Sequence, residues 1–296
     1  MIPQKLLLVG LDFAGKTSIL RVLTQNYSLM EKTKPTVGIE REIIKILGAD
    51  IIIWDLGGQE KYRTEYLNDM RVFAETQTLY FVVDILSPTK YELALQYFTT
   101  ILIMIESLGI KPQINLCLHK VDPDLQTDPQ TQQQVQKARK LFLTNSRGFD
   151  ISVFNTTIFD PKSIVRAFTK TFQTLITSLQ PFEKIIQSVV AQLELDGAML
   201  FDENLMLLSE FYNNEACKDL CLNVVYETVR DLQEADSLSS EEKFVENFES
   251  HINLKSKKQN FRVLPLKIKD WNLYLLTVGK DVVDIQMVYD SFSSMI

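Results

Sequence analysis

The sequence predicts an α/β protein with two domains, and two patterns of apolar residues lead to this prediction. Over residues 1–180, short apolar runs alternate with segments of helical periodicity, which is typical of a mainly parallel sheet covered by helices. After Gln180-Pro181, strand-like runs follow one another as hairpins, which favours an antiparallel sheet with flanking helices. We therefore expect an α/β domain with a mainly parallel six-stranded sheet at 1–180 and a smaller α+β domain at 181–296.

Six runs of apolar and β-branched residues are expected to form the sheet of the first domain. Two of them, Lys5–Val9 and Leu79–Val83, contain a continuous apolar run, as in strands that are buried on both faces. Two others flank the turn Gly48-Ala49-Asp50 and predict a hairpin. The six expected strands are Lys5–Val9, Ile39–Leu47, Ile51–Trp54, Leu79–Val83, Ile114–Leu118 and Asp150–Asn155.

Segments of helical periodicity connect these strands and continue beyond the domain boundary. In the first domain we expect helices at Ser18–Leu23, 90–108, Thr131–Leu143 and Pro161–Leu179. In the second domain we expect helices at Phe182–Leu193, Glu215–Ala235 and Asp281–Phe292, and strands at Gly197–Phe201, Leu205–Leu208, Asn260–Ile268 and Trp271–Val278. The polar stretch 236–258 is expected to be partly helical or mobile.

The charge and the cysteine content narrow the classes of function. The net charge is −7, with +2 in residues 1–180 and −9 in residues 181–296, so neither part offers a basic surface for nucleic acid. Three cysteines are too few for a disulfide framework, and no run of apolar residues is long enough to span a membrane. No lipid-anchor motif is present either. We expect a cytoplasmic protein that binds no nucleic acid and reaches an internal membrane only through a partner.

Residues Gly10–Thr17 match the phosphate-binding pattern G-x-x-x-x-G-K-[ST] between the first expected strand and the first helix. In such a P-loop, successive backbone N–H groups and the helix N-terminus point at one phosphate group. Lys16 would neutralise the β- and γ-phosphates, and the Thr17 hydroxyl would bind Mg²⁺. The nucleotide-binding residues expected in this loop are Asp12, Ala14, Gly15, Lys16, Thr17 and Ser18.

Three further positions fit a nucleoside triphosphate with Mg²⁺. Asp55 ends an apolar strand, where its carboxylate can hold the metal, and the Gly58 N–H can approach the γ-phosphate. Gln59 follows directly and is the candidate catalytic residue, because its amide can orient an attacking water. Thr36 is the candidate second hydroxyl ligand of Mg²⁺, on a loop that orders when a γ-phosphate is present.

Lys120 and Asp122 follow the fifth expected strand and predict a guanine site. A carboxylate can accept hydrogen bonds from N1–H and the exocyclic amine of guanine together, and adenine offers no such pair. The Lys120 stem can cover the base and brace the P-loop. The preceding His119 has three open readings: a contact to N7 of the base, a brace for the P-loop, or a packed core side chain. An ATPase or small-molecule kinase is the alternative that Asp122 disfavours.

These motifs together resemble a small GTPase of the Ras superfamily, and two branches of it contribute. The stretches Gly10–Thr17, Lys34–Gly38 and Trp54–Gln59 resemble Arf-family proteins. The sequence His119-Lys120-Val121-Asp122, with His where most GTPases carry Asn, resembles the Rag/Gtr family, as does Thr156–Asp160. The chain is identified as similar to a Rag/Gtr GTPase with an Arf-like P-loop and switch motifs, so that 1–180 would be the G domain.

The resemblance also has consequences beyond the G domain. Rag/Gtr proteins continue into a roadblock (longin-like) domain, and Gly197–Asp202 looks like its first strand. The resemblance implies a homodimer or heterodimer through residues 181–296, with protein effectors, a GAP and an exchange factor, in nutrient and growth signalling. It implies GTP or GDP with Mg²⁺ as the ligands, and base contacts from Thr157 and Ile158.

Three readings of the function therefore stand at the sequence level. The first is a Rag/Gtr-type switch that hydrolyses GTP slowly on its own, because no arginine finger can be assigned, and faster with a GAP. The second is an Arf-like GTPase of membrane traffic. The third is a scaffold that binds nucleotide with little hydrolysis, which the presence of Lys16, Thr17, Asp55 and Gln59 argues against.

Overall fold

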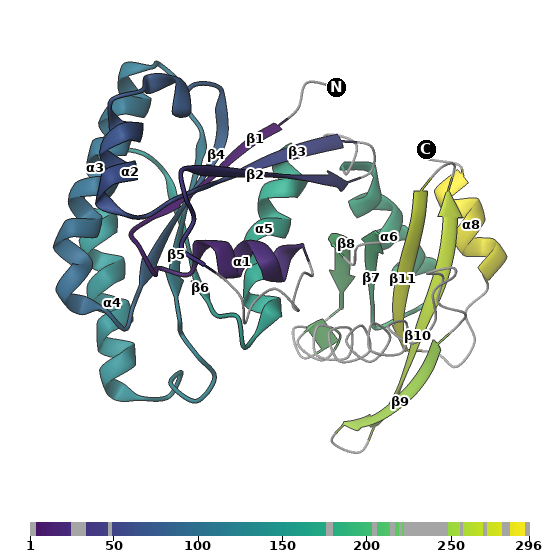
Figure 1. The fold of residues 1–296 in the computed structure, drawn as a ribbon. Helices are drawn as coiled ribbons and strands as arrows, with labels where there is room; N and C mark the ends of the chain where they lie inside the picture. The colour runs from purple at the N-terminus through teal and green to yellow at the C-terminus, as the bar shows by residue number, and fades with distance from the viewer. Residues whose placement is uncertain are drawn as a thin grey trace. The chain divides into compact units, whose positions relative to one another are not determined.

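The computed structural model shows two compact units, Met1–Thr171 and Phe172–Ile296, each built around its own sheet (Figure 1). The residues that it describes are 4–24, 34–46, 49–175, 180–202, 206–213, 217–218, 221, 248–254, 257–268, 271–279 and 285–293. Among these residues, no helix is both long and apolar enough to cross a membrane.

The first unit contains the expected six-stranded sheet, in the order β2-β3-β1-β4-β5-β6. Only β2 and β3 pair in antiparallel fashion, and the other neighbours are parallel, which confirms the predicted class. Each expected strand is present, with ends close to those predicted. The strands are β1 (Gln4–Gly10), β2 (Ile39–Ile46), β3 (Ala49–Leu56), β4 (Thr76–Asp84), β5 (Gln113–His119) and β6 (Ile151–Thr156).

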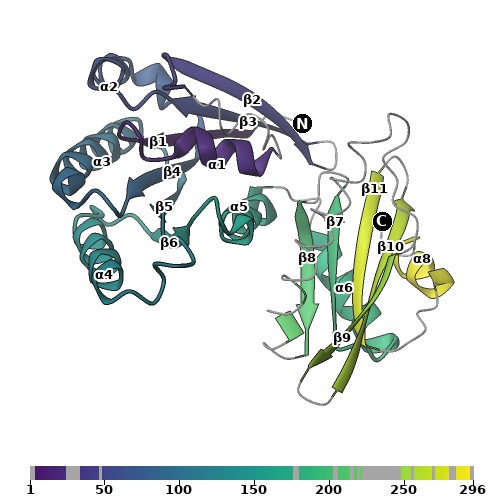
Figure 2. The ribbon, with the colours of Figure 1, turned by 60° about the horizontal axis from the view of Figure 1, so that its bottom comes forward.

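Helices cover both faces of this sheet, as Figure 2 shows: α2, α3 and α4 lie on one face, and α1 and α5 on the other. Strand β4 shows why its sequence is continuously apolar. The Phe81 ring packs on Phe98 and Phe142 at 4.9 and 5.8 Å, whereas the neighbouring Tyr80 stacks at 4.1 Å on Phe168 of α5. The helices are α1 (Lys16–Leu23), α2 (Glu60–Leu67), α3 (Tyr91–Ser107), α4 (Pro129–Thr144) and α5 (Pro161–Leu175).

One helix of this unit, α2, and two short 3₁₀ helices are absent from the expectations. The sequence of α2 is mostly polar, and only Arg63 and Tyr66 are buried in it, so it lacks the apolar stripe by which a helix is recognised. The 3₁₀ helices are η2 (Met70–Val72) and η3 (Pro88–Lys90).

The second unit contains the expected antiparallel sheet, in the order β8-β7-β11-β10-β9. Helices α6 and α8 pack on each other, with the Phe182 and Phe292 rings 6.0 Å apart, and both contact the sheet. The elements are α6 (Gln180–Gln192), β7 (Gly197–Asp202), β8 (Leu207–Tyr212), β9 (Phe248–Leu254), β10 (Lys257–Ile268), β11 (Trp271–Gly279) and α8 (Ile285–Ser293).

Two expectations for the second unit are corrected. The strand expected at Leu205–Leu208 begins at Leu207, because Asp202 and Met206 close a turn in which the Met206 N–H donates to Asp202 Oδ1 at 2.7 Å. The stretch 236–258, expected to be partly helical or mobile, contains the strand β9, which is paired with β10 over its whole length. The strand depends on pairing with a neighbour more than on its own sequence pattern.

Other expected segments fall partly or mainly outside the described residues. Of the helix expected at Glu215–Ala235, only Cys217, Lys218 and Cys221 are described, and they are helical. The last residues of Pro161–Leu179 and the first of Asp281–Phe292 are also outside the described part.

Candidate nucleotide-binding site

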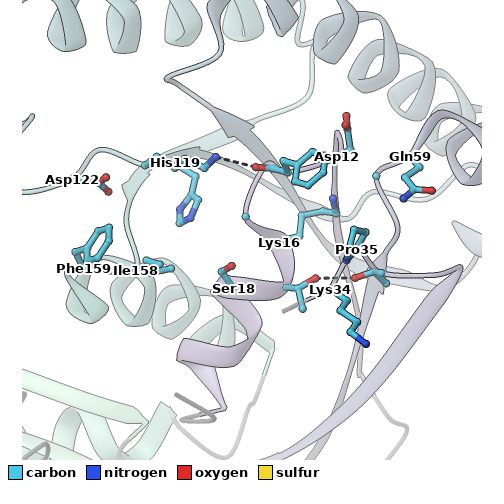
Figure 3. A pocket seen from close by; sticks show the side chains of 16 residues that line it. Asp12, Lys16, Ser18, Lys34, Pro35, Gln59, His119, Asp122, Ile158 and Phe159 are labelled. Atoms are coloured by element: carbon cyan, nitrogen blue, oxygen red, sulfur yellow. Dashed lines mark hydrogen bonds between the residues drawn. The ribbon is translucent and has the colours of Figure 1, made fainter. Parts of the chain in front are cut away.

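A cavity of about 420 Å³ opens at the C-terminal ends of the parallel strands in the first unit. Figure 3 shows Asp122, Ile158 and Phe159 at one end of it and Gln59 and Pro35 at the other. Most of the site residues predicted from the sequence line it, and Ala14, Asp55 and Thr157 lie buried behind the wall. The lining residues are Asp12, Phe13, Gly15, Lys16, Thr17, Ser18, Lys34, Pro35, Thr36, Gly58, Gln59, His119, Lys120, Asp122, Ile158 and Phe159.

Lys16 stands between the two ends of the cavity as a buried cation (Figure 3). Its ammonium donates to the carbonyl oxygens of Gly10 at 3.1 Å and Leu11 at 2.8 Å. Burial lowers the pKa of Lys16 to about 8, although the nearby Asp55 carboxylate acts in the opposite direction. A buried ammonium that lines a cavity and has only neutral carbonyls as hydrogen-bond partners is suited to an anionic ligand.

Thr17, Thr36 and Asp55 form a compact cluster of oxygen atoms next to Lys16. The Thr17 hydroxyl donates to Asp55 Oδ2 at 2.5 Å and lies 2.8 Å from the Thr36 hydroxyl, which donates to the same carboxylate oxygen at 3.2 Å. The other oxygen, Asp55 Oδ1, is buried without a hydrogen-bond partner, and burial raises the pKa of this carboxyl group. Two hydroxyls and an incompletely satisfied carboxylate are ligands that fit Mg²⁺.

Glycine at position 58 lets the turn after β3 lie directly on the P-loop. A Cβ atom on Gly58 would meet the carbonyl carbon and oxygen of Leu11 at 2.3 Å, and a backbone contact of this kind cannot yield. Gln59 follows as the N-terminal cap of α2, with its side chain exposed at the cavity. The backbone N–H of Gly58 and the Gln59 amide are thereby brought to the same end of the cavity as Thr36.

At the other end, Lys120 and Asp122 are held by contacts from three other segments. The Lys120 ammonium donates to the Phe13 carbonyl at 3.0 Å and to Asp84 Oδ2 at 2.7 Å. The Thr157 hydroxyl donates to Asp122 Oδ1 at 2.5 Å, which fixes the carboxylate beside Ile158. An acceptor group and an apolar wall at the mouth of a cavity suit a planar heterocycle that carries N–H donors.

His119 lies beneath the P-loop and is almost fully buried. Its Nδ1 atom is 3.0 Å from the Thr156 hydroxyl, and burial lowers the pKa of the imidazole to about 4. A Cβ atom on Gly15 would lie 2.4 Å from the ring, so the two residues are in close contact. Gly15 also has φ of 95°, which is a backbone conformation that favours glycine.

Several residues that line or support the cavity were given no role from the sequence alone. Asp84 is one, because nothing in its local sequence shows that it pairs with Lys120. Phe13 and Phe159 line the cavity with largely exposed rings. Lys34 and Pro35 also line the cavity. Their position directly before Thr36 in the sequence could have predicted this.

A sequence profile described as the Gtr1/RagA G protein conserved region matches residues 5–232, which is most of the chain. The chain belongs to the Gtr1/RagA family. Among individual relatives, it is 24% identical over 218 residues to "GTP-binding protein gtr1" of Schizosaccharomyces pombe, covering 72% of this chain and 70% of that protein. It is 28% identical over 206 residues to "GTP-binding protein GTR2" of Saccharomyces cerevisiae, covering 67% of this chain and 58% of that protein.

This Gtr1/RagA family member is also similar to an Arf-like protein over a shorter stretch. The chain is 36% identical over 88 residues to "ADP-ribosylation factor-like protein 5" of Caenorhabditis elegans, which covers 29% of this chain and 46% of that protein. The Arf-like similarity is therefore higher in identity but shorter, whereas the Gtr1/RagA similarity extends into the second unit.

Proposed function

We propose that this chain is a Mg²⁺-dependent guanine-nucleotide switch that binds GTP and hydrolyses it slowly to GDP and phosphate. The observation that carries the proposal is the cavity in which a buried Lys16, the oxygen cluster around Asp55 and the Asp122 carboxylate occur together. The names of the relatives as GTP-binding proteins support the choice of nucleotide.

In this proposal the P-loop end of the cavity holds the phosphates. Lys16 neutralises the β- and γ-phosphates, and the loop N–H groups from Asp12 to Ser18 donate to phosphate oxygens. Thr17, Thr36 and Asp55 hold Mg²⁺, which when bound supplies positive charge against the phosphate oxygens. The contact of Thr36 with this cluster would tie the 34–38 segment to the triphosphate state.

The opposite end of the cavity holds the base. Asp122 accepts from N1–H and the exocyclic amine of guanine, and Thr157 keeps the carboxylate in place. Ile158 and the Lys120 stem cover the base, while the Lys120 ammonium fixes the P-loop through the Phe13 carbonyl. We assign His119 to bracing the P-loop, because its ring contacts Gly15 and its Nδ1 atom pairs with Thr156.

Gln59 is the proposed catalytic residue, with Lys16 stabilising the charge on the transferred phosphoryl group. Its side-chain amide, exposed at the γ-phosphate end, would accept from and orient the attacking water. We expect slow intrinsic turnover, on the order of 10⁻⁴ to 10⁻² s⁻¹, and faster hydrolysis with a GAP.

We extend the proposal to the second unit as an association domain. The antiparallel five-stranded sheet with α6 and α8, and the likeness of Gly197–Asp202 to a roadblock strand, support a dimer through residues 181–296. Protein effectors, a GAP and an exchange factor would read or reset the nucleotide state in nutrient signalling. The protein would act in the cytoplasm and reach an internal membrane through a partner. An Arf-like function in membrane traffic is the second candidate, supported by the similarity to ADP-ribosylation factor-like protein 5.

The test is a nucleotide competition assay with Mg²⁺, followed by single-turnover hydrolysis. GTP and GDP should displace a fluorescent guanine nucleotide, whereas ATP should not. Asp122→Asn should shift the preference toward xanthine nucleotides, because an amide presents a donor to the base, whereas Asp124→Asn, on the same loop but exposed, should not. Gln59→Leu should slow hydrolysis without loss of binding. Displacement by ATP as readily as by GTP would contradict guanine recognition, and an unchanged rate for Gln59→Leu would contradict the role of that residue.

A further inference from the structure

Arg63 on α2 is a nearly buried cation, only 9% exposed, whose contacts are not explained by the site described above. Its Nε–H donates to the Gly58 carbonyl at 3.0 Å, and its guanidinium carbon lies 5.3 Å from the centre of the Tyr97 ring on α3. Within the described part of the chain, no carboxylate forms an ion pair with it. Removing a guanidinium from water without a carboxylate partner costs free energy, so we expect the two contacts that Arg63 makes to serve a function.

The carbonyl that Arg63 binds belongs to the peptide between Gly58 and Gln59. On one side this peptide is confined by the P-loop, because the Gly58 Cα leaves no room for a Cβ against the Leu11 backbone. On the other side the hydrogen bond from Arg63 fixes its carbonyl, and a charged donor makes such a bond stronger than a neutral one. The peptide that precedes the exposed Gln59 side chain is therefore held from both sides.

Tyr97 contributes its ring to this arrangement, and its hydroxyl makes no hydrogen bond. The hydroxyl oxygen is buried and has no hydrogen-bond partner, whereas the ring lies within cation–π distance of the guanidinium. Arginine is suited to this position, because one planar group can stack on a ring and donate from Nε at its edge. Lysine would carry the charge but could not make both contacts with the same geometry.

We propose that Arg63 is a positioning residue for hydrolysis: it fixes the Gly58–Gln59 peptide against the P-loop and thereby directs the Gln59 amide into the cavity. Tyr97 aligns Arg63, so that α3 is coupled to the hydrolytic end of the site. This inference rests on the proposed GTPase function and assigns to it a residue that does not itself line the cavity but contacts the lining residue Gly58.

The test is a double-mutant cycle between Arg63→Gln and Gln59→Leu, read by single-turnover GTP hydrolysis and by GDP affinity. Arg63→Gln alone should slow hydrolysis by about tenfold, the effect of losing one charge-assisted hydrogen bond, and leave GDP affinity unchanged. In the Gln59→Leu protein the same substitution should cause no further loss, because the side chain that it positions is absent. The matched control is Arg71→Gln, at a solvent-exposed arginine of the following 3₁₀ helix η2, which should hydrolyse GTP at the wild-type rate.

Two substitutions at Tyr97 keep the inference open to refutation if Arg63→Gln fails to fold. Tyr97→Phe keeps the ring and should hydrolyse GTP normally, and Tyr97→Leu removes it and should lose part of the rate. Equal losses in the wild-type and Gln59→Leu backgrounds, or a parallel loss of GDP affinity, would show a merely structural role and overturn the inference. A normal rate for Arg63→Gln would overturn it while leaving the proposed function intact. A wild-type protein that binds GTP but does not hydrolyse it would overturn both.

Discussion

His119 shows how burial in this fold changes the proton binding of a single residue. Burial and the nearby Lys120 charge lower the pKa of its imidazole to about 4, against a weaker opposite effect of Asp84. The unfolded chain therefore binds a proton between about pH 6.5 and pH 4 that the folded chain excludes. The free energy of unfolding should fall as the pH is lowered through this window, by at most about 3 kcal/mol from this residue.

Chemical denaturation of the nucleotide-free protein at a series of pH values measures this effect. His119→Asn cannot titrate, so its stability should depend less steeply on pH between 6.5 and 4, whatever its absolute value. Other acidic groups, including Asp55 with its raised pKa, are common to both proteins and cancel in the comparison. Parallel curves for the two proteins would show that His119 titrates normally in the folded state.

At the scale of residues, the spacing of the motifs along the chain predicted where the cavity lies. It did not predict the contacts that support the cavity. Lys16 and Asp122 are far apart in the chain but meet because the carboxyl ends of parallel strands converge. Asp84 pairs with Lys120, whose backbone is left-handed with φ of 70°, and no sequence pattern predicts either the conformation or the pairing. Arg63 was missed for a related reason, because its partner is a backbone carbonyl.

At the scale of elements, the segment before β2 is attached to α2 through one carbonyl group. The Gly38 oxygen accepts from the Tyr66 hydroxyl at 2.6 Å and from the Gly57 N–H at 2.9 Å. Burial raises the pKa of Tyr66 to about 12, so this hydroxyl remains a donor at neutral pH. The two segments that flank the γ-phosphate end of the cavity are thus joined outside it.

Tyr66→Phe removes one of these two bonds and should loosen the segment that carries Thr36. We expect faster hydrogen exchange at residues 36–39 and a loss of about 1 kcal/mol in the free energy of unfolding. Tyr62→Phe, on the same helix, is the matched control and should change neither quantity. Unchanged exchange at 36–39 in Tyr66→Phe would show that the Gly57 bond alone holds the segment.

The elements that the sequence predicted least well are those that depend on tertiary contacts. Helix α2 is held through Arg63 and Tyr66, which are polar or amphipathic side chains and give no apolar stripe. Strand β9 lies at the edge of its sheet and is defined by its pairing with β10. By contrast, buried strands such as β1 and β4 can be recognised in the sequence by their continuous apolar runs.

At the scale of the whole molecule, each of the two units has its own core, and the first unit ends within α5, at Thr171. Tyr80 joins this helix to the sheet: its ring stacks on Phe168, and its hydroxyl donates to the Ala167 carbonyl at 2.9 Å and pairs with the Thr171 hydroxyl. All of these residues belong to Met1–Thr171. The six-stranded sheet, helices α1 to α4, most of α5 and every residue of the cavity are therefore contained in one unit.

A chain that ends at residue 180 should consequently fold and bind guanine nucleotide with an affinity close to that of the full chain. It retains the whole of α5 as described, including Ile164 and Phe168, whose burial covers one face of the sheet. A chain that ends at residue 163 lacks this cover and should fail to fold, because it loses several large buried side chains, Ile164, Phe168 and Phe172 among them, at a cost of several kcal/mol. Circular dichroism with thermal melting and titration with fluorescent GDP measure both outcomes. An unfolded 1–180 chain would mean that the first unit depends on the second for its stability.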